Sequence, residues 1–273
     1  MTSDRVEILG VRFDNLTRTE AARAIAVLSQ SGQRAYVVKP YSEFMPRAVR
    51  DAGIHDLLND ADLCLPDGIG ILWAAHYLAL QGGRARALWQ LPLSLASLAL
   101  NPAAIRRPLK ENMAGVDLTW EMLTALDEIG ATIFLLGGTQ TELLGTQERL
   151  ESRFPHLLVV GAHSGHFSLR GPQNDAIVAE INAAAPQALL VAMGFPLQER
   201  WISANLPRLN VNVAIAEGGS FSFISGATRR APAWMRRAGL EWLFRLFRQP
   251  SRLRRQLALP VFVWLVVKAR LTA

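Results

Sequence analysis

One carboxylate stands out among the residues of this chain that could do chemistry. Asp67 lies in the run LPDGIG (residues 65–70), between an apolar segment that predicts a strand (62–65) and one that predicts a helix (69–80). In open α/β sheets, ligands bind in the loops that leave the carboxyl ends of strands. A carboxylate there can accept a proton as a general base. It can equally cap the helix that follows, and spacing alone leaves both roles open.

Glycine-containing loops follow the other predicted strands. They are Gly137-Gly138 and residues 161–165, 194–196 and 217–220, the last including Gly218. Glycine lets backbone amides approach a ligand, and the helix starts behind these loops favour anions such as a nucleotide-sugar diphosphate. Turns also need glycine for conformational reasons, so a structural role is equally compatible. None of the loops has P-loop or dinucleotide-fingerprint spacing.

Gln198 and Glu199 open a predicted helix at the same edge, directly after residues 194–197. A glutamine there can hydrogen-bond sugar hydroxyls without adding charge, whereas Glu199 could merely complement the helix dipole.

We predict no metal site. Asp60 and Asp62 imitate an Asp-x-Asp motif but span a helix end and a strand start, which favours a solvated turn. His163 and His166 lack a third ligand.

The elements that must position these residues alternate regularly. Residues 6–13 predict a hairpin, and Thr17 with Glu20 has the spacing of a capping box that starts a helix. A helix opening at residue 43 is expected to be interrupted at Pro46. Strands are predicted at 36–38, 62–65, 132–136, 157–161, 188–193 and 211–216, with helices between them. This alternation predicts an α/β fold with a mostly parallel sheet and helices on both faces.

Composition indicates one main domain (1–228) and an appendage (229–273). The chain has 273 residues, of which 50% are hydrophobic, enough for a sizeable core. Its one cysteine, Cys64, can form no disulfide framework, which suits a reducing cytoplasm. The N-terminus lacks a basic and then apolar leader, so we expect no export.

The appendage is strongly basic. Residues 229–273 hold ten arginines and one lysine against the single acid Glu241, and aromatic residues are interleaved with them. This pattern suits an anionic membrane surface, with rings at headgroup depth and guanidinium groups on phosphates. The arginines expected to contact membrane or diphosphate are Arg236, Arg237, Arg245, Arg248 and Arg252. Nucleic-acid binding is the weaker alternative, because a sheet with sugar-nucleotide loops has no use for it; helix packing accounts for some of the aromatics.

Residues 81–111 interrupt the alternation with a proline-broken apolar run. It is too short and broken for a membrane span. Three roles are compatible with this segment: an amphipathic lid, a membrane-facing flap, or a contact between copies of the chain in a homo-oligomer.

Several motifs occur in a fixed order and carry a family resemblance. They are LPDGIG (65–70), AGVDL (114–118), FLLGG (134–138), GFPLQE (194–199), RRAP (229–232) and GLEWLFRL (239–246). Over about residues 6–256 the chain resembles the WecG/TagA/CpsF family of bacterial glycosyltransferases, including its GumM-type hexosyltransferase branch.

The resemblance implies a Rossmann-like fold and an inverting transfer of a hexose or N-acetylhexosamine from a UDP-sugar to a polyprenyl-diphosphate-linked glycan. It implies Asp67 as the base, Gln198 as a substrate ligand, no metal or cofactor, and a membrane-associating tail on the cytoplasmic face of the bacterial plasma membrane. The expected substrate-binding residues are Lys39, Tyr41, Glu43, Gly137, Gly138, Gln198, Glu199, Gly218, Arg229 and Arg230.

Departures from the family pattern concern the donor. Lys39 and Tyr41 replace a common threonine and asparagine, Asn112 replaces an arginine, Leu197 replaces a lysine, and residues 81–111 are longer than usual. Glucose and N-acetylmannosamine therefore both stay open as the sugar. The alternative is a non-catalytic sugar-nucleotide or lipid-glycan binding component of a polysaccharide assembly complex.

Overall fold

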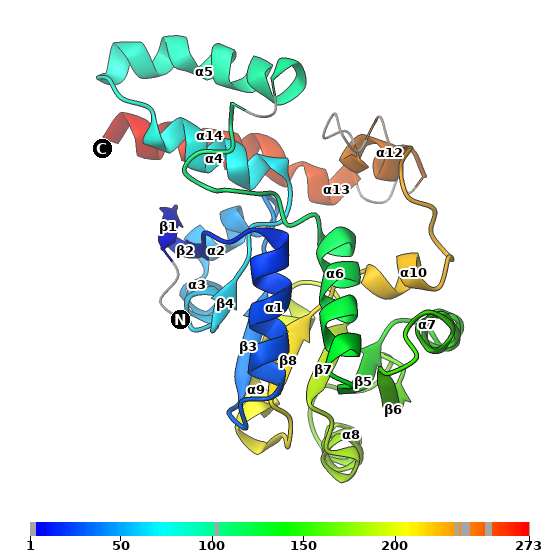
Figure 1. Cartoon of the computed structure of the whole chain (residues 1–273). Coiled ribbons are helices and arrows are strands. Elements are labelled where there is room, and N and C mark those ends of the chain that lie inside the picture. Colours follow the sequence, from blue (N-terminus) through cyan, green and yellow to red (C-terminus); the bar gives the residue numbers. More distant parts are fainter. Residues whose placement is uncertain (1–3, 102–103, 233–234, 236–240, 249–252, 273) are drawn as a thin grey trace.

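A six-stranded sheet forms the centre of the fold (Figure 1). The computed structural model describes residues 4–101, 104–232, 235, 241–248 and 253–272. The strand order is β4-β3-β8-β7-β5-β6, and each of these neighbouring pairs is parallel. The strands are β3 (Ala35–Val38), β4 (Leu63–Cys64), β5 (Thr132–Gly137), β6 (Leu158–His163), β7 (Ala188–Ala192) and β8 (Val213–Ala216). The predicted Rossmann-like α/β class is confirmed.

Both faces of the sheet are buried, because alternate residues of each strand point to opposite sides. In β7, Leu189 and Val191 belong to one apolar cluster and Ala188 and Leu190 to the other. The first cluster packs against α2 (Met45–Arg50), α3 (Ala52–Asn59), α4 (Ile69–Ala79), α8 (Pro172–Ala184) and α9 (Leu197–Asn205), which the 3-10 turn η1 (Leu206–Arg208) follows. The second packs against α1 (Arg18–Ser29), α6 (Gly115–Glu128), α7 (Gln140–Arg153) and α10 (Ser220–Ile224).

The N-terminal elements follow local sequence signals. β1 (Arg5–Ile8) and β2 (Val11–Asp14) form the predicted antiparallel hairpin, with Gly10 at φ 84° in its turn. Thr17 and Glu20 exchange hydrogen bonds as a capping box at the start of α1. The predicted interruption at Pro46 is wrong. This proline lies in the first turn of α2, where its missing N–H costs the helix nothing.

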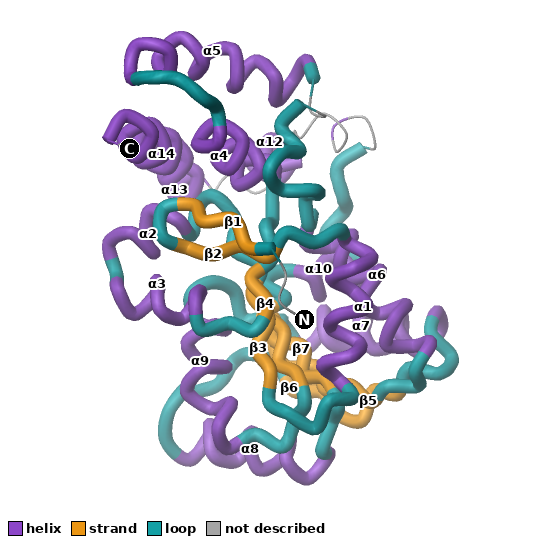
Figure 2. Tube along the Cα trace, turned by 60° about the vertical axis from the view of Figure 1, so that its left-hand side comes forward, coloured by secondary structure: helices purple, strands orange, loops and turns teal. Residues whose placement is uncertain are grey.

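The segment 81–111 and the C-terminal region contribute helices at one end of the molecule. α5 (Arg84–Leu100) contains Pro92, and the C-terminal region holds α12 (Glu241–Arg248), α13 (Leu253–Gln256) and α14 (Ala258–Thr272). α14 packs against α2, α4 and α5, and both views place α5 beyond the layer of α4 and α14 (Figures 1 and 2). None of the helices in the described ranges is long and apolar enough to cross a membrane.

Candidate active site

Asp67 lies in the loop between β4 and α4, at the carboxyl edge of the sheet. This loop runs beside the one that follows β3, because Leu65 N donates to Val38 O (2.9 Å) and Asp67 N donates to Pro40 O (3.1 Å). The Asp67 side chain is half-buried, so it combines a fixed position with access to a ligand.

The start of α6 holds this loop in place. Asp67 Oδ1 accepts a hydrogen bond from Gly115 N (3.1 Å), and Asn112 Oδ1 accepts one from Gly68 N (2.8 Å). Of the two roles left open for Asp67, capping of α4 is not the one observed: the N-cap of α4 is Gly68, at φ 88°, and the structure shows no side-chain capping bond there. The carboxylate instead accepts a hydrogen bond from a backbone amide in the first turn of α6, which has no partner within that helix and lies 48 residues further along the chain.

A buried ion pair lies between the ends of the adjacent strands β3 and β8. Lys39 Nζ is 2.6 Å from Glu217 Oε1, and Thr119 Oγ1 donates to Glu217 Oε2 (2.6 Å). All three side chains are buried, so the opposite charge and the hydroxyl offset the desolvation of the carboxylate. Thr119 lies one turn after Gly115, and α6 thus joins the ion pair to the Asp67 loop.

Gln198 connects two further loops of this edge. Its Oε1 accepts hydrogen bonds from Gly194 N (3.0 Å), after β7, and from Gly218 N (2.9 Å), after β8. Its Nε2 donates to Glu199 Oε1 (2.8 Å), and the side chain is only 3% exposed. In this conformation the amide oxygen fixes the loops through their backbones.

Glu199 is buried, and among the described residues its carboxylate forms no ion pair. Its Oε2 and the Tyr36 hydroxyl are buried atoms that make no hydrogen bond with the described residues. Burial raises the pKa of Glu199 to about 7, against the smaller opposing effect of the Gln198 hydrogen bond. Burial, and then the charge of Glu199, raises the pKa of Tyr36 well above its usual value. The neutral carboxyl is therefore substantially populated near neutral pH.

The glycines at positions 137 and 138 are required by the backbone. Gly137 has φ 125°, and a Cβ there would lie 2.4 Å from Ala192 O. Gly138 N donates to the same carbonyl (3.0 Å), so this amide is already engaged.

Tyr41 and Glu43 are half-buried after β3, with the Tyr41 ring edge-on to Phe44 at 4.4 Å.

The predicted tail arginines fall into different groups. Arg230 forms an ion pair with Asp117 in the first turn of α6, and Arg229 is exposed. The backbones of Arg245 and Arg248 belong to α12. Arg236, Arg237 and Arg252 lie outside the described residues.

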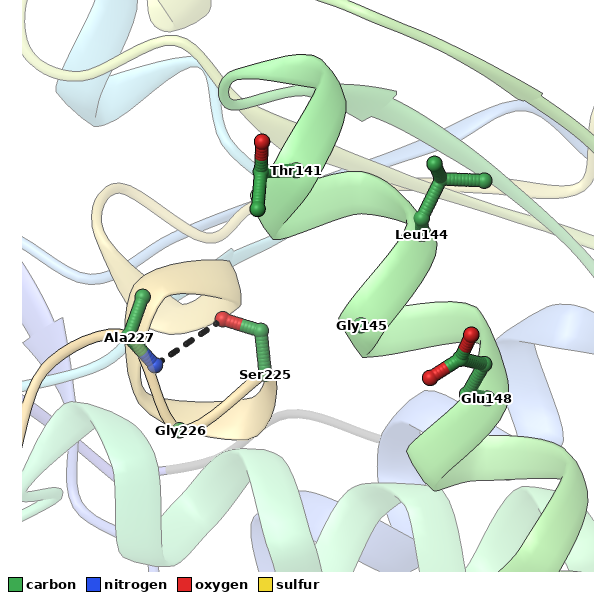
Figure 3. A pocket seen from close by; sticks show the side chains of 7 residues that line it. All are labelled: Thr141, Leu144, Gly145, Glu148, Ser225, Gly226 and Ala227. Atoms are coloured by element: carbon green, nitrogen blue, oxygen red, sulfur yellow. Dashed lines mark hydrogen bonds between the residues drawn. The ribbon is translucent and has the colours of Figure 1, made fainter.

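A surface depression of about 480 Å³ lies elsewhere, between α7 and the loop after α10 (Figure 3). It is lined by Thr141, Leu144, Gly145, Glu148, Ser225, Gly226 and Ala227, none of them a predicted site residue. Across the described part of the chain, no group of three or more His, Cys, Asp or Glu side chains could hold a metal ion.

Thr119, Gly115 and Glu217 were not among the predicted site residues, although Gly115 lies in the motif AGVDL and Glu217 in the loop 217–220. Glu217 had a local signal, since it ends a predicted strand beside Gly218. Its pairing with Lys39 follows only from the adjacency of β3 and β8, because the two residues are 178 positions apart in the sequence.

The parallel sheet defines an α/β protein, and the polar side chains at its carboxyl edge form a candidate ligand site at the ends of the strands. The chain belongs to the glycosyl transferase WecG/TagA/CpsF family, which matches residues 6–89 and 91–273. Two similar proteins come from Staphylococcus aureus strains MW2 and NCTC 8325. Each is an N-acetylglucosaminyldiphosphoundecaprenol N-acetyl-beta-D-mannosaminyltransferase, 27% identical over 268 residues that cover 97% of this chain and 93% of the relative. The family resemblance of the ordered motifs is thereby confirmed.

Proposed function

We propose that this protein transfers a hexose or N-acetylhexosamine, with inversion, from a UDP-sugar to a polyprenyl-diphosphate-linked glycan. The reaction belongs to the synthesis of bacterial surface polysaccharide or exopolysaccharide, on the cytoplasmic face of the plasma membrane. Support comes from the family and from the lipid-linked acceptor in the names of the relatives.

The position of the Asp67 carboxylate is the observation that best supports the proposal. Three acidic side chains at this edge have other surroundings: Glu217 is buried against Lys39, Glu199 is buried beside Gln198, and Asp117 pairs with Arg230. Asp67 is half-buried, and a helix-start amide fixes its position. A base needs this combination of access and fixed geometry.

The proposed transfer is a single displacement. The acceptor hydroxyl gives its proton to the Asp67 carboxylate while its oxygen bonds to C1 of the donor sugar. The bond from C1 to the UDP oxygen breaks on the opposite face, and UDP leaves with that electron pair. Backbone amides and arginines can stabilise the charge on the departing diphosphate. One carboxylate suffices, since no covalent intermediate forms.

Two donor sugars are tested first, one taken from the names of the relatives and one from a substitution beside the Asp67 loop. Their names specify an N-acetylmannosaminyl group, which makes UDP-N-acetylmannosamine the first donor to test. UDP-glucose is the second, because Asn112 binds Gly68 N where the family commonly has an arginine. That substitution removes a cation beside the Asp67 loop.

The test is Asp67→Asn in the full chain, assayed with radiolabelled UDP-sugars and polyprenyl-diphosphate-linked N-acetylglucosamine. An asparagine oxygen can still accept the hydrogen bond from Gly115 N, so the variant removes basicity and keeps the contact. We expect the transfer rate to fall roughly 10²- to 10⁴-fold.

Asp60→Asn is the matched control, because it makes the same change at an exposed position before β4. Its rate should equal that of the unmodified protein. If Asp67→Asn is equally active, Asp67 is not the base; if the unmodified protein binds UDP-sugars and transfers none of them, the non-catalytic alternative holds.

A further inference from the structure

Helix α5 exposes apolar side chains along its outer side. Trp89, Leu93 and Leu100 are 78%, 69% and 83% exposed, and Ala85 and Ala96 are exposed as well. These positions recur every three or four residues and so share one side of the helix. A surface helix usually turns polar residues outward, and α5 does the opposite.

The inner side of α5 is held by hydrogen bonds to the end of α4 and beyond it. Ser94 is buried and accepts a hydrogen bond from Trp73 Nε1 (3.1 Å), and the Tyr77 hydroxyl donates to Ala87 O (2.9 Å). Gln90 Nε2 donates to Gln81 O (3.1 Å). Because these contacts fix which side faces inward, the apolar outer side stays exposed, and an exposed apolar patch of this kind marks an interaction surface.

The chain around this face is basic. Between Asp67 and Glu111 it has no acidic residue, and it has none after Glu241. Arg84 and Arg86 at the start of α5 are exposed, as are Arg106 and Arg107 in the segment that follows the helix. An apolar stripe flanked by exposed cations complements an anionic lipid surface, with the indole ring at headgroup depth.

The C-terminal helix α14 lies at the same end of the molecule and also exposes an apolar side chain. α14 contacts both α4 and α5, and Arg270 Nη2 donates to Gln90 Oε1 (3.4 Å). Trp264 of α14 is 57% exposed. α4 begins directly after the Asp67 loop, so this layer borders the candidate active site (Figures 1 and 2).

We propose that the outer face of α5, with its flanking arginines, lies on an anionic phospholipid bilayer. It forms a second membrane contact beside the basic C-terminal region and sets the distance of the Asp67 loop from the lipid surface. The assignment to a bilayer rests on the proposed function, whose acceptor is lipid-linked. With 17 residues and an internal proline, α5 would lie in the interface and not cross it.

Vesicle flotation of the full chain tests the proposal. The variant Trp89→Glu/Leu93→Glu is compared with Val27→Glu/Leu144→Glu, which makes matched changes at exposed apolar positions on α1 and α7. With vesicles of phosphatidylcholine and about 30% phosphatidylglycerol, we expect the α5 variant to bind at least about tenfold more weakly. The control should bind like the unmodified protein, and binding of the unmodified protein should fall without phosphatidylglycerol.

Activity separates this proposal from the proposed function. Transfer to a short-chain, water-soluble acceptor should be unchanged in the α5 variant, whereas transfer to an acceptor embedded in vesicles should fall with binding. Flotation needs no transfer, so it decides the matter even if no sugar is moved. Equal flotation of the two variants would overturn the proposal. Unchanged flotation together with loss of a dimer in light scattering would assign the face to a second copy of the chain.

Discussion

At the scale of single residues, two buried glutamates at the same sheet edge differ in how their negative charge is compensated. Glu217 accepts a hydrogen bond from the Thr119 hydroxyl and pairs with Lys39, which compensates its charge. Glu199 has neutral hydrogen-bond donors, the Gln198 amide and its own backbone N–H, and burial raises its pKa to about 7. A buried carboxylate without a compensating cation favours its neutral form. Stability should therefore depend on pH through Glu199.

Replacing Glu199 by glutamine should change that dependence. In the unfolded chain the carboxyl loses its proton near its ordinary pKa of 4.5, whereas the folded protein retains it up to about 7. The folded state binds more protons between these values, so stability falls as pH rises through this window and levels off above it. Relative to the unmodified protein, Glu199→Gln should gain roughly 2–3 kcal/mol between about pH 5 and about pH 8.5.

Urea unfolding at the two pH values measures this difference. Glu180→Gln, at an exposed position of α8, is the control and should show a pH dependence like that of the unmodified protein. A stability difference between Glu199→Gln and the unmodified protein that is the same at both pH values would contradict the assignment.

At the scale of elements, the start of α6 positions the proposed base. Gly115 donates its amide to Asp67, and Thr119 one turn later contacts the buried ion pair. Glycine is needed at position 115 for space, because a Cβ there would lie 3.0 Å from Asp67 Oδ2. A methyl group would have to displace the carboxylate by a few tenths of an ångström.

Gly115→Ala should therefore lower kcat more than it lowers stability. We expect a decrease of roughly ten- to a hundredfold, since small misplacements of a catalytic group are costly. Steady-state transfer assays measure the rate, and thermal unfolding checks the fold. Gly83→Ala is the control, because a Cβ at that position meets no atom within 4 Å. Equal rates for the two variants would show that the carboxylate position is not limiting.

At the scale of the whole molecule, the C-terminal helix is part of the main core. Phe262 and Val266 of α14 are buried in the cluster that includes Trp73, whose ring centroid lies 6.3 Å from that of Phe262. Deleting residues 229–273 would uncover this cluster as well as removing the basic region. Membrane release is therefore better tested with surface substitutions than with truncation.

Phe262→Ala should lower the free energy of unfolding by about 3–5 kcal/mol, the usual cost of emptying a buried aromatic site. Trp264→Ala, two residues away and 57% exposed, should cost much less. Denaturant unfolding of the two variants makes the comparison. Similar stabilities would mean that α14 does not dock on α4 in solution.

Much of the fold was predictable because its signals are local. The capping box at Thr17, the hairpin turn at Gly10 and the short apolar strands each depend on a few neighbouring positions. The α/β class follows from their alternation. The partner of Asp67 was not predictable, because the amide that donates a hydrogen bond to it belongs to a helix 48 residues further along the chain.

The sequence by itself determined the strands and most helices, the family, and Asp67 as a carboxylate at a strand end. Periodicity, turn residues and ordered motifs carry that information within short windows. Tertiary structure alone decided which side chains meet: Lys39 with Glu217, Gln198 between two loops, Asp67 on α6, and α14 over Trp73. Strand order brings these distant positions together, and burial then sets their charge states and partners.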